Sequence, residues 1–420
     1  MIFYRSFLFI LVLLLGCSNV FGKTKADRDD ESVAPDSKAE HESAPASVPS
    51  LTKEQTEGLR ALGYFDRAKT QNPDARSVTT EKERACDGLN LYGSRDRAEA
   101  YLVDMGGKVL HTWKAPNPKP PWMHMVLLHD GSLLVISKAN YVAKLDKDSK
   151  VLWKTPLGAH HDVTVAPDGN IYVLTHKLNH YHHRDVDIPI MDDYIVVLSP
   201  DGKELSKHRL FPVLRSLVST RRLDRLAEQT RAGVSARKLI AEGAPGDTSH
   251  TNSLQVLSRP IEGIAPAGSI LLSVREIDRI VILDKNVEKV LWSWGKGELE
   301  GQHHATHLEN GNILLFDNGV RRKQSRVLEM DPVSGKIVWS FAQKGFYTRL
   351  RGSAQKLPCG NVLAVESDSG HAVEISPDKK VVWEFWNPDV RGKETPTRAV
   401  IYRMMRYPLD YLDQGVLKQH

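Results

Sequence analysis

One unit recurs six times along the chain, and this repeat limits the fold more than any other feature. Its first half is an apolar strand, an Asp or Ser, a turn, a Lys and a second apolar strand, as in Ala143-Lys-Leu-Asp-Lys-Asp-Ser-Lys-Val-Leu-Trp153. Its second half places Asp-Gly or Asn-Gly between two β-rich runs, as in Ala305-Thr-His-Leu-Glu-Asn-Gly-Asn-Ile-Leu-Leu-Phe316, which is a strong hairpin signal. Each unit is therefore expected to form four antiparallel strands.

The spacing of the units indicates the architecture. The anchoring Asp or Ser residues stand at positions 104, 146, 199, 284, 331 and 376, at intervals of 42, 53, 85, 47 and 45 residues. Four-stranded units with a period of about 40–50 residues are typical of a β-propeller, so six units predict an all-β, six-bladed β-propeller. A pair of β-sandwiches does not explain one pattern repeated six times. Bulky packing between neighbouring blades is expected from the Trp that shares one slot in four units: Trp153, Trp292, Trp339 and Trp383.

The 85-residue interval contains an insertion at about 211–246. It has Leu and Ile at helical spacing and lacks an Asp-Gly hairpin, so one or two amphipathic helices are expected. From Lys207 to Lys238 it carries nine basic and two acidic residues. One interpretation is a lid or basic rim that attracts anions. The other is a solvated helical face that packs on a blade.

The N-terminal segment has the features of an export signal. Arg5 precedes the apolar run from Phe7 to Leu15, which has the length of a signal-peptide core and is too short to span a bilayer as a mature helix. The run ends Leu14-Leu15-Gly16-Cys17, which resembles a bacterial lipobox. Residues 1–16 are therefore predicted to be a lipoprotein signal peptide, with Cys17 as the lipidated residue. Cleavage after Gly22 is the alternative, and both predict an exported, periplasmic protein.

The remaining organisation follows from composition. Residues 17–85 are expected to be a disordered tether with a short helix beginning near Thr52, because residues 23–50 contain no aromatic residue, Leu or Ile. The propeller is assigned to residues 86–411, and residues 412–420 form a C-terminal tail. If Cys17 is an anchor, Cys86 and Cys359 remain, at opposite ends of the folded region. An oxidising compartment favours a disulfide between them, and two unrelated buried thiols are the alternative.

Histidine is concentrated at one position of the repeat. Aligned on the turn glycines, His161 and His303 both lie eight residues before the glycine, and His124 lies seven before it. The innermost strands of a propeller line its central channel, so residues just before these strands are expected to converge on the axis. The residues at this position in the other units are His250, which is accompanied by Asn252, and Ser353.

A fixed cation accompanies these histidines. Arg275 follows an apolar strand in the same unit as His250 and could point into the channel. A guanidinium suits planar oxyanions because it donates two parallel hydrogen bonds. The alternative is a surface salt bridge with Glu276 or Asp278. A cationic, donor-rich pocket fits a transferring anionic group better than a metal ion.

Four motifs resemble the bacterial arylsulfate sulfotransferases (arylsulfotransferases, ASST). They are His160-His161-Asp162, Asp247-Thr-Ser-His-Thr-Asn252, Leu271-Leu-Ser-Val-Arg275, and Gln302-His303 running into Asn318-Gly319. The resemblance implies a periplasmic six-bladed propeller that moves a sulfuryl group from one phenol to another. It also implies a sulfohistidine intermediate, ping-pong kinetics, no nucleotide sulfate donor, no metal and no other cofactor.

The resemblance assigns roles by position. His303 would be the nucleophile, and His161, His250, Arg275 and Asn252 would bind the sulfuryl oxygens and assist proton transfer. His161 and His303 are favoured over their neighbours His160 and His304, because adjacent strand residues point to opposite faces. Further substrate-binding candidates are His124, His160, His304 and Ser353. The aromatic candidates for gripping a substrate ring are Phe346, Tyr347 and Tyr402.

Other functions stay open at this level. A net charge of +5 does not argue for nucleic acid. The expected partners are an aryl sulfate donor and a phenolic acceptor, with membrane contact only through a lipid on Cys17, while a homo-oligomer remains open. The alternatives are a non-catalytic propeller that binds sulfated ligands or a protein partner, and a metal-dependent propeller hydrolase. A hydrolase of this kind would bind its metal with a cluster of polar residues that is otherwise interpreted as a polar loop. The cluster consists of His176, His180, His182 and His183, with Asp185 and Asp187.

Overall fold

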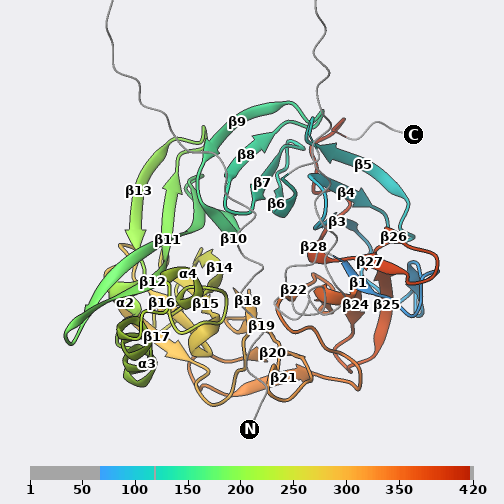
Figure 1. The fold of residues 1–420 in the computed structure, drawn as a ribbon. Helices are drawn as coiled ribbons and strands as arrows, with labels where there is room; N and C mark the ends of the chain where they lie inside the picture. The colour runs from blue at the N-terminus through green and yellow to red at the C-terminus, as the bar shows by residue number, and fades with distance from the viewer. Residues whose placement is uncertain (1–66, 118–119, 417–420) are drawn as a thin grey trace, which may run out of the picture. The chain divides into compact units, whose positions relative to one another are not determined.

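Six antiparallel sheets form a ring of blades in the computed structural model, which describes residues 67–117 and 120–416 (Figure 1). The described residues all belong to one structural unit, residues 52–420. The inner strands of neighbouring blades contact one another in cyclic order, so the ring is closed. The prediction of a six-bladed propeller is confirmed. The predicted signal peptide, the lipidation at Cys17, the short helix near Thr52 and most of the tether lie outside the described residues.

Each blade has four consecutive strands from the axis outward, except the first. Blade 2 contains β6 (Trp122–Leu127), β7 (Leu133–Ser137), β8 (Tyr141–Leu145) and β9 (Val151–Pro156); blade 3 contains β10 (Ala159–Val165), β11 (Ile171–His183), β12 (Val186–Leu198) and β13 (Glu204–Arg209). Blade 4 contains β14 (Thr251–Val256), β15 (Ile270–Val274), β16 (Arg279–Leu283) and β17 (Val290–Trp294); blade 5 contains β18 (His303–His307), β19 (Ile313–Asp317), β20 (Arg326–Met330) and β21 (Ile337–Phe341). Blade 6 contains β22 (Ser353–Lys356), β23 (Val362–Glu366), β24 (His371–Ile375) and β25 (Val381–Trp386).

Blade 1 joins the two ends of the folded chain. Its inner strand is β28 (Ile401–Tyr407), and its outer strands are β3 (Leu89–Ser94), β4 (Glu99–Val103) and β5 (Val109–Lys114). The tether ends earlier than predicted, because residues 67–85 contain two strands rather than disordered chain. β2 (Val78–Thr79) extends blade 6 along β25, and β1 (Arg67–Lys69) pairs with β27 (Thr397–Ala399), which also pairs with β26 (Val390–Arg391).

The conserved slots of the repeat have direct physical roles. The anchoring carboxylates and hydroxyls accept backbone N–H bonds within their own turns; the Asp146 carboxylate, for example, accepts the N–H of Lys150 at 2.8 Å. Several of the Trp side chains donate their indole N–H to a carbonyl in the next blade, as from Trp153 to Pro200 at 3.0 Å. In blade 4 this donor is Trp294, while Trp292 packs against the apolar cluster between blades 4 and 5, as predicted. Apolar side chains of neighbouring blades form a buried cluster at each of the six junctions.

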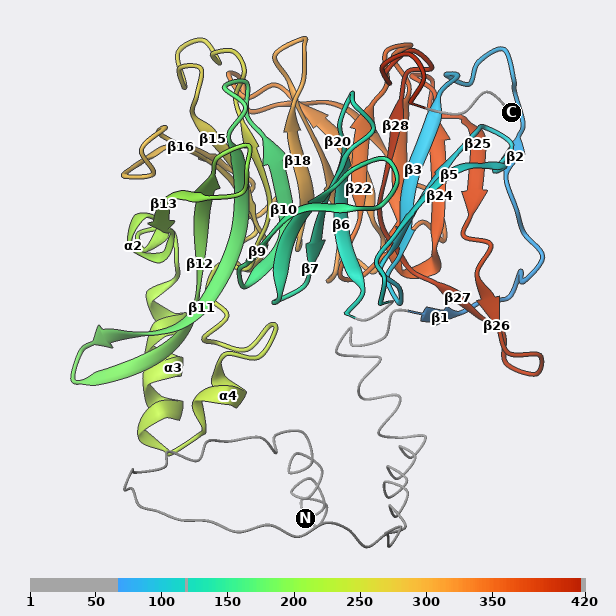
Figure 2. The ribbon, with the colours of Figure 1, turned by 90° about the horizontal axis from the view of Figure 1, so that it is seen from above.

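The insertion is helical, as predicted, and it packs on an extension of blade 3. It contains α2 (Phe211–Leu214), α3 (Thr220–Arg231) and α4 (Ala236–Leu239). The expectation of a polar loop at 176–183 is wrong, because β11 and β12 continue their ladder to the pair of His183 with Val186. Alternate residues of this hairpin pack with the helices in one apolar cluster, which explains why it is ordered. Figure 2 shows the hairpin end, α3 and α4 together at one side of the blades.

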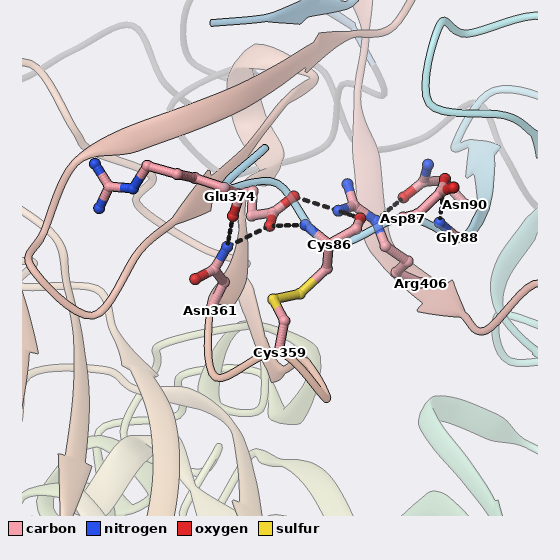
Figure 3. Close-up of a disulfide and its surroundings, with 9 residues drawn as sticks. Cys86, Asp87, Gly88, Asn90, Cys359, Asn361, Glu374 and Arg406 are labelled. Atoms are coloured by element: carbon pink, nitrogen blue, oxygen red, sulfur yellow. Dashed lines mark hydrogen bonds and ion pairs between the residues drawn. A yellow bond between two sulfur atoms is a disulfide. The ribbon is translucent and has the colours of Figure 1, made fainter. Parts of the chain in front are cut away.

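The seam between blades 6 and 1 is cross-linked. Cys86 and Cys359 form the predicted disulfide, with Cα atoms 5.9 Å apart (Figure 3). Beside it, Glu374 forms a buried ion pair with Arg406 and accepts the Cys86 N–H at 2.7 Å. Arg406 also donates to the Cys86 carbonyl at 2.8 Å. The disulfide and this ion pair therefore hold the N-terminal segment, the closing strand β28 and blade 6 together.

Among the described residues, the structure has no helix that is both long enough and apolar enough to cross a membrane.

Candidate functional site

The inner strands are irregular at the point where the predicted site residues stand. The pairing register shifts near the start of β6, β10, β14, β18 and β28. Three histidines at these starts have positive φ angles, namely His161 (57°), His250 (47°) and His304 (52°). Such bulges turn side chains away from simple alternation, and positive φ is uncommon outside glycine. The local backbone is therefore shaped to aim side chains rather than to continue the ladder.

Four side chains form one continuous hydrogen-bonded chain across three blades. The Asp247 carboxylate lies 2.7 Å from Nδ1 of His250, whose Nε2 lies 3.0 Å from Nε2 of His161. Nδ1 of His161 lies 2.8 Å from the hydroxyl of Tyr402. Two of the predicted histidines are thus in direct contact, through atoms that can pass a proton.

The pKa shifts within this chain indicate where the proton resides. Burial lowers the pKa of His250, but the charge and hydrogen bond of Asp247 outweigh burial and raise it overall. Burial, together with the charge of His250, lowers the pKa of His161 well below its usual value. Burial raises the pKa of Tyr402 to about 12. His250 is therefore the proton carrier and donates to His161, which remains neutral and donates in turn to the Tyr402 oxygen.

His303 is held in one tautomer by its surroundings. Its Nδ1 lies 2.8 Å from Oδ1 of Asn318 and 3.0 Å from the carbonyl of Gly301. The orientation of the Asn318 amide is set because its NH₂ donates to the carbonyls of Thr348 and Arg351. Both neighbours of Nδ1 are thus acceptors, so Nδ1 carries the hydrogen and Nε2 carries the lone pair.

The electron pair on Nε2 of His303 is buried in a positive environment. The side chain is 2% exposed, and Nε2 has no hydrogen-bond partner among residues 67–117 and 120–416. Burial, followed by the charge of Arg275, lowers the pKa of His303 well below its usual value. The imidazole is therefore neutral at physiological pH, as a nucleophile must be.

Both interpretations of Arg275 hold in part. Its guanidinium lies 2.9 Å from Glu276 and 3.8 Å from Glu242, which is the predicted type of ion pair. Its side chain is nevertheless only 10% exposed, and its charge acts on His303. Its Nε is one of the buried polar atoms without a partner in the described part of the chain. Arg275 is therefore a largely buried cation with one donor, Nε, that has no partner in the described part of the chain.

Asn252 and Ser353 also present polar atoms at the inner strands. Asn252 donates its side-chain N–H to the carbonyl of Gln302 at 2.8 Å, which links blade 4 to the strand that begins with His303. Its Oδ1 and the Oγ of Ser353 are both buried without a hydrogen-bond partner among the described residues. Buried polar atoms are usually paired, so such atoms commonly face a ligand or water.

His124 and His304 belong to a second network around Arg403. The Arg403 guanidinium pairs with Asp162 at 2.7 Å and lies 3.4 Å from His124. His304 accepts the backbone N–H of Ala354, and the charge of Arg403 contributes to lowering its pKa after burial. These two histidines therefore surround a buried ion pair that borders the Tyr402–His161–His250–Asp247 chain, because Arg403 lies over the ring of Tyr402.

Residues 124–388 match the family model described as Arylsulfotransferase (ASST). The chain belongs to the arylsulfotransferase family. Its sequence matches no curated protein. Among solved structures, it is similar to a protein of unknown function from Bacteroides caccae, with 13% identity, coverage of 76% of this chain and 99% of that chain, and a TM-score of 0.50. A streptogramin B lyase is 13% identical over 81% of this chain and 97% of that chain, with a TM-score of 0.45.

The aromatic candidates of this arylsulfotransferase-family chain have different environments. Phe346 is buried and packs against Phe316 and Phe341, so the expectation that it grips a substrate ring is wrong. Tyr402 contacts His161 through its hydroxyl, as described above. Tyr347 is only partly buried, and its backbone N–H donates to Glu366.

The sequence pattern indicates the histidines of the site but not several of their polar partners. Asp247 and Asn318 stand within the motifs that define the family resemblance, but their roles depend on contacts that a repeat does not reveal. Arg403 lies on the closing strand, which lacks a following Asp-Gly hairpin because its partner strand lies more than 300 residues earlier. The missing sixth inner strand had to lie near the C-terminus, and its polar residues include Arg403.

Proposed function

We propose that this arylsulfotransferase-family chain transfers a sulfuryl group from a phenolic sulfate ester to a phenolic acceptor through a covalent intermediate on His303. Family membership supports the class of reaction. The observation that carries the assignment of the nucleophile is the tautomer of His303, since Asn318 and Gly301 leave the electron pair on Nε2. No step of the proposed reaction depends on a bound cofactor.

In the first half-reaction, Nε2 of His303 attacks the sulfur of the donor. The S–N bond forms as the bond between sulfur and the aryl oxygen breaks, and the sulfuryl group carries its charge on three oxygens, like a transferring phosphoryl group. In this proposal Arg275, whose Nε has no partner among the described residues, donates to these oxygens, and Asn252 donates the amide hydrogen that it does not give to the Gln302 carbonyl. Stabilisation of developing charge by such preorganised donors is worth about 3–4 kcal/mol for each donor.

The leaving phenoxide needs a proton, and the acceptor phenol must lose one. The chain from Asp247 through His250 and His161 to the Tyr402 hydroxyl can supply the first and take up the second, because His250 holds a proton that Asp247 stabilises and each link is a hydrogen bond. In the second half-reaction the deprotonated acceptor attacks the sulfohistidine, the S–N bond breaks, and His303 is regenerated. Two half-reactions through one intermediate give ping-pong kinetics.

We also propose that the protein is exported to the periplasm, where a lipid attached to Cys17 anchors it to the membrane. The disulfide between Cys86 and Cys359 supports an oxidising compartment. The signal-like N-terminus supports export. Labelling with a radioactive fatty acid, compared between the wild type and Cys17→Ser, tests the anchor.

The decisive experiment is an assay of the purified full chain with para-nitrophenyl sulfate and phenol, beside His303→Ala. Nitrophenol release that requires phenol and is lost in the variant supports transfer through His303. His307→Ala, a change on the same strand in a half-buried side chain, is the matched control and should stay active. Release without an acceptor would indicate a sulfatase, and stabilisation by sulfated ligands without turnover would indicate a binding propeller.

A further inference from the structure

Blade 3 brings together a second group of titratable side chains that the proposed reaction does not use. His160 lies on β10, His176 on β11 and Asp193 on β12. One potential ligand atom from each of the three lies within 4.8 Å of the others. They come from three adjacent strands of one sheet, so the framework that positions them is rigid.

His160 is the observation that points to a ligand. Its side chain is 2% exposed, and neither ring nitrogen has a hydrogen-bond partner in the part of the chain that the structure describes. Its Nε2 lies 3.4 Å from Oδ1 of Asp193, at ion-pair distance but outside hydrogen-bond geometry. Leaving buried polar atoms unpaired is unfavourable, so a buried imidazole in this state normally has a further partner.

The other two members lie close to His160, and the carboxylate of Asp193 is held in place by hydrogen bonds. Oδ2 of Asp193 accepts the hydroxyl of Ser249 and the backbone N–H of Thr251, each at 2.7 Å, which orients Oδ1 toward His160. Such secondary hydrogen bonds hold ligating carboxylates in place. The ring of His176 stacks on that of His160 with centroids 4.4 Å apart.

We propose that His160, His176 and Asp193 bind a divalent transition-metal ion, with Zn²⁺ as the best match. Two imidazoles and one carboxylate are a common zinc ligand set, and three protein ligands leave a fourth position for water. Ligand atoms about 2.0–2.1 Å from a tetrahedral zinc are about 3.4 Å apart, which is the separation found between His160 and Asp193.

The histidines of the long hairpin do not gather into the site that the sequence suggested. His182 pairs with Asp187 and His183 pairs with Asp224, both farther along the ladder. Only His176 of that group turns toward Asp193. The proposed ion therefore differs from the metal centre of a hydrolase built on the whole His176–His183 tract.

A metal ion bound here would hold active-site residues in place rather than take part in the reaction. His160 directly precedes His161, and Asp193 is bonded to the backbone at Thr251, next to His250. Metal binding would therefore fix the starts of β10 and β14, where the two relay histidines have strained backbone angles. This inference does not depend on whether His303 is a nucleophile.

The test uses the full chain treated with a chelator and then titrated with ZnCl₂. We expect one bound Zn²⁺ per chain by elemental analysis, and a rise in Tm of several degrees at saturating metal. Co²⁺ should give the visible absorption of a tetrahedral nitrogen–oxygen site. His176→Ala, at a partly exposed position that leaves the other two ligands in place, should weaken Zn²⁺ binding at least 10-fold.

Two further variants make the outcome decisive. His182→Ala removes an exposed histidine of the same hairpin and should leave the affinity unchanged, which excludes adventitious binding along β11. His303→Ala should retain the metal, so failure of the proposed transferase reaction would not affect this result. Equal stoichiometry and Tm shift in the wild type and His176→Ala, or the absence of both in the wild type, would overturn the proposal.

Discussion

The contact between Asp247 and His250 offers a quantitative test of the proton relay. Asp247→Asn keeps the shape of the side chain and an oxygen that can accept from His250 and Gly243, but it removes the negative charge. A hydrogen bond to a charged group contributes about 1.5–3 kcal/mol. At 1.36 kcal/mol for each factor of ten, this predicts a fall of about 10–150-fold in kcat/KM for transfer between phenols.

The same substitution should change the pH dependence in a defined direction. Because Asp247 raises the pKa of His250, the proton needed by the leaving group persists to higher pH in the wild type. In Asp247→Asn the alkaline limb of the kcat/KM profile should move to lower pH. The pair stabilises the fold fully below the usual His pKa of about 6.5 and above the usual Asp pKa of about 3.9, and the contribution of His250 is lost as pH rises through its raised pKa. The stability difference between wild type and variant should therefore shrink at high pH.

The control is Asp224→Asn, which removes a carboxylate of α3 that pairs with Arg184 and His183, away from the relay. Rates measured with para-nitrophenyl sulfate across the pH range, together with urea unfolding at two pH values, distinguish the two variants. The reasoning is refuted if Asp247→Asn keeps kcat/KM within twofold of the wild type with an unshifted alkaline limb.

Two other substitutions probe the relay and the seam. Tyr402→Phe keeps the ring but removes the hydroxyl at 2.8 Å from His161, so the variant should lose about 1–3 kcal/mol of unfolding free energy by urea denaturation; an unchanged midpoint would contradict the contact. Cys86→Ser opens a cross-link between residues 273 positions apart and should cost about 3–5 kcal/mol by the same assay, whereas reducing agent should destabilise only the wild type.

Most of the fold could be predicted from the repeat, because the residue type at each shared position of the unit has a local physical cause. The turn carboxylates cap their own hairpins, and the Trp indoles reach the neighbouring blade, so both leave a residue-type signal at a fixed position. The long β11–β12 hairpin was missed because its histidines and aspartates resemble a solvated loop. One face of the hairpin is covered by the helices of the insertion. These helices lie too far away in the sequence for a local pattern to reveal the contact.

The candidate site was likewise predictable only in part. The slot rule located His161, His250 and His303, since these residues share a position in the repeat. It did not separate them from His124, and the strand alternation that favoured His161 and His303 over His160 and His304 is interrupted at the bulges, where the backbone adopts positive φ angles. Partners such as Asn318 come from loops between strands, where repeats carry no common signal.

The arrangement of blade 1 has a consequence for biogenesis. A chain that crosses a membrane N-terminus first delivers β3, β4 and β5 early, but their inner partner β28 arrives only with residues 401–407. Until then three strands lack their pairing edge, and Arg406 cannot neutralise Glu374 beside the cysteines. In a chain that emerges in this order, ring closure has to wait for β28, and a chain truncated before β28 would present an unpaired β-edge to chaperones and proteases rather than a smaller propeller.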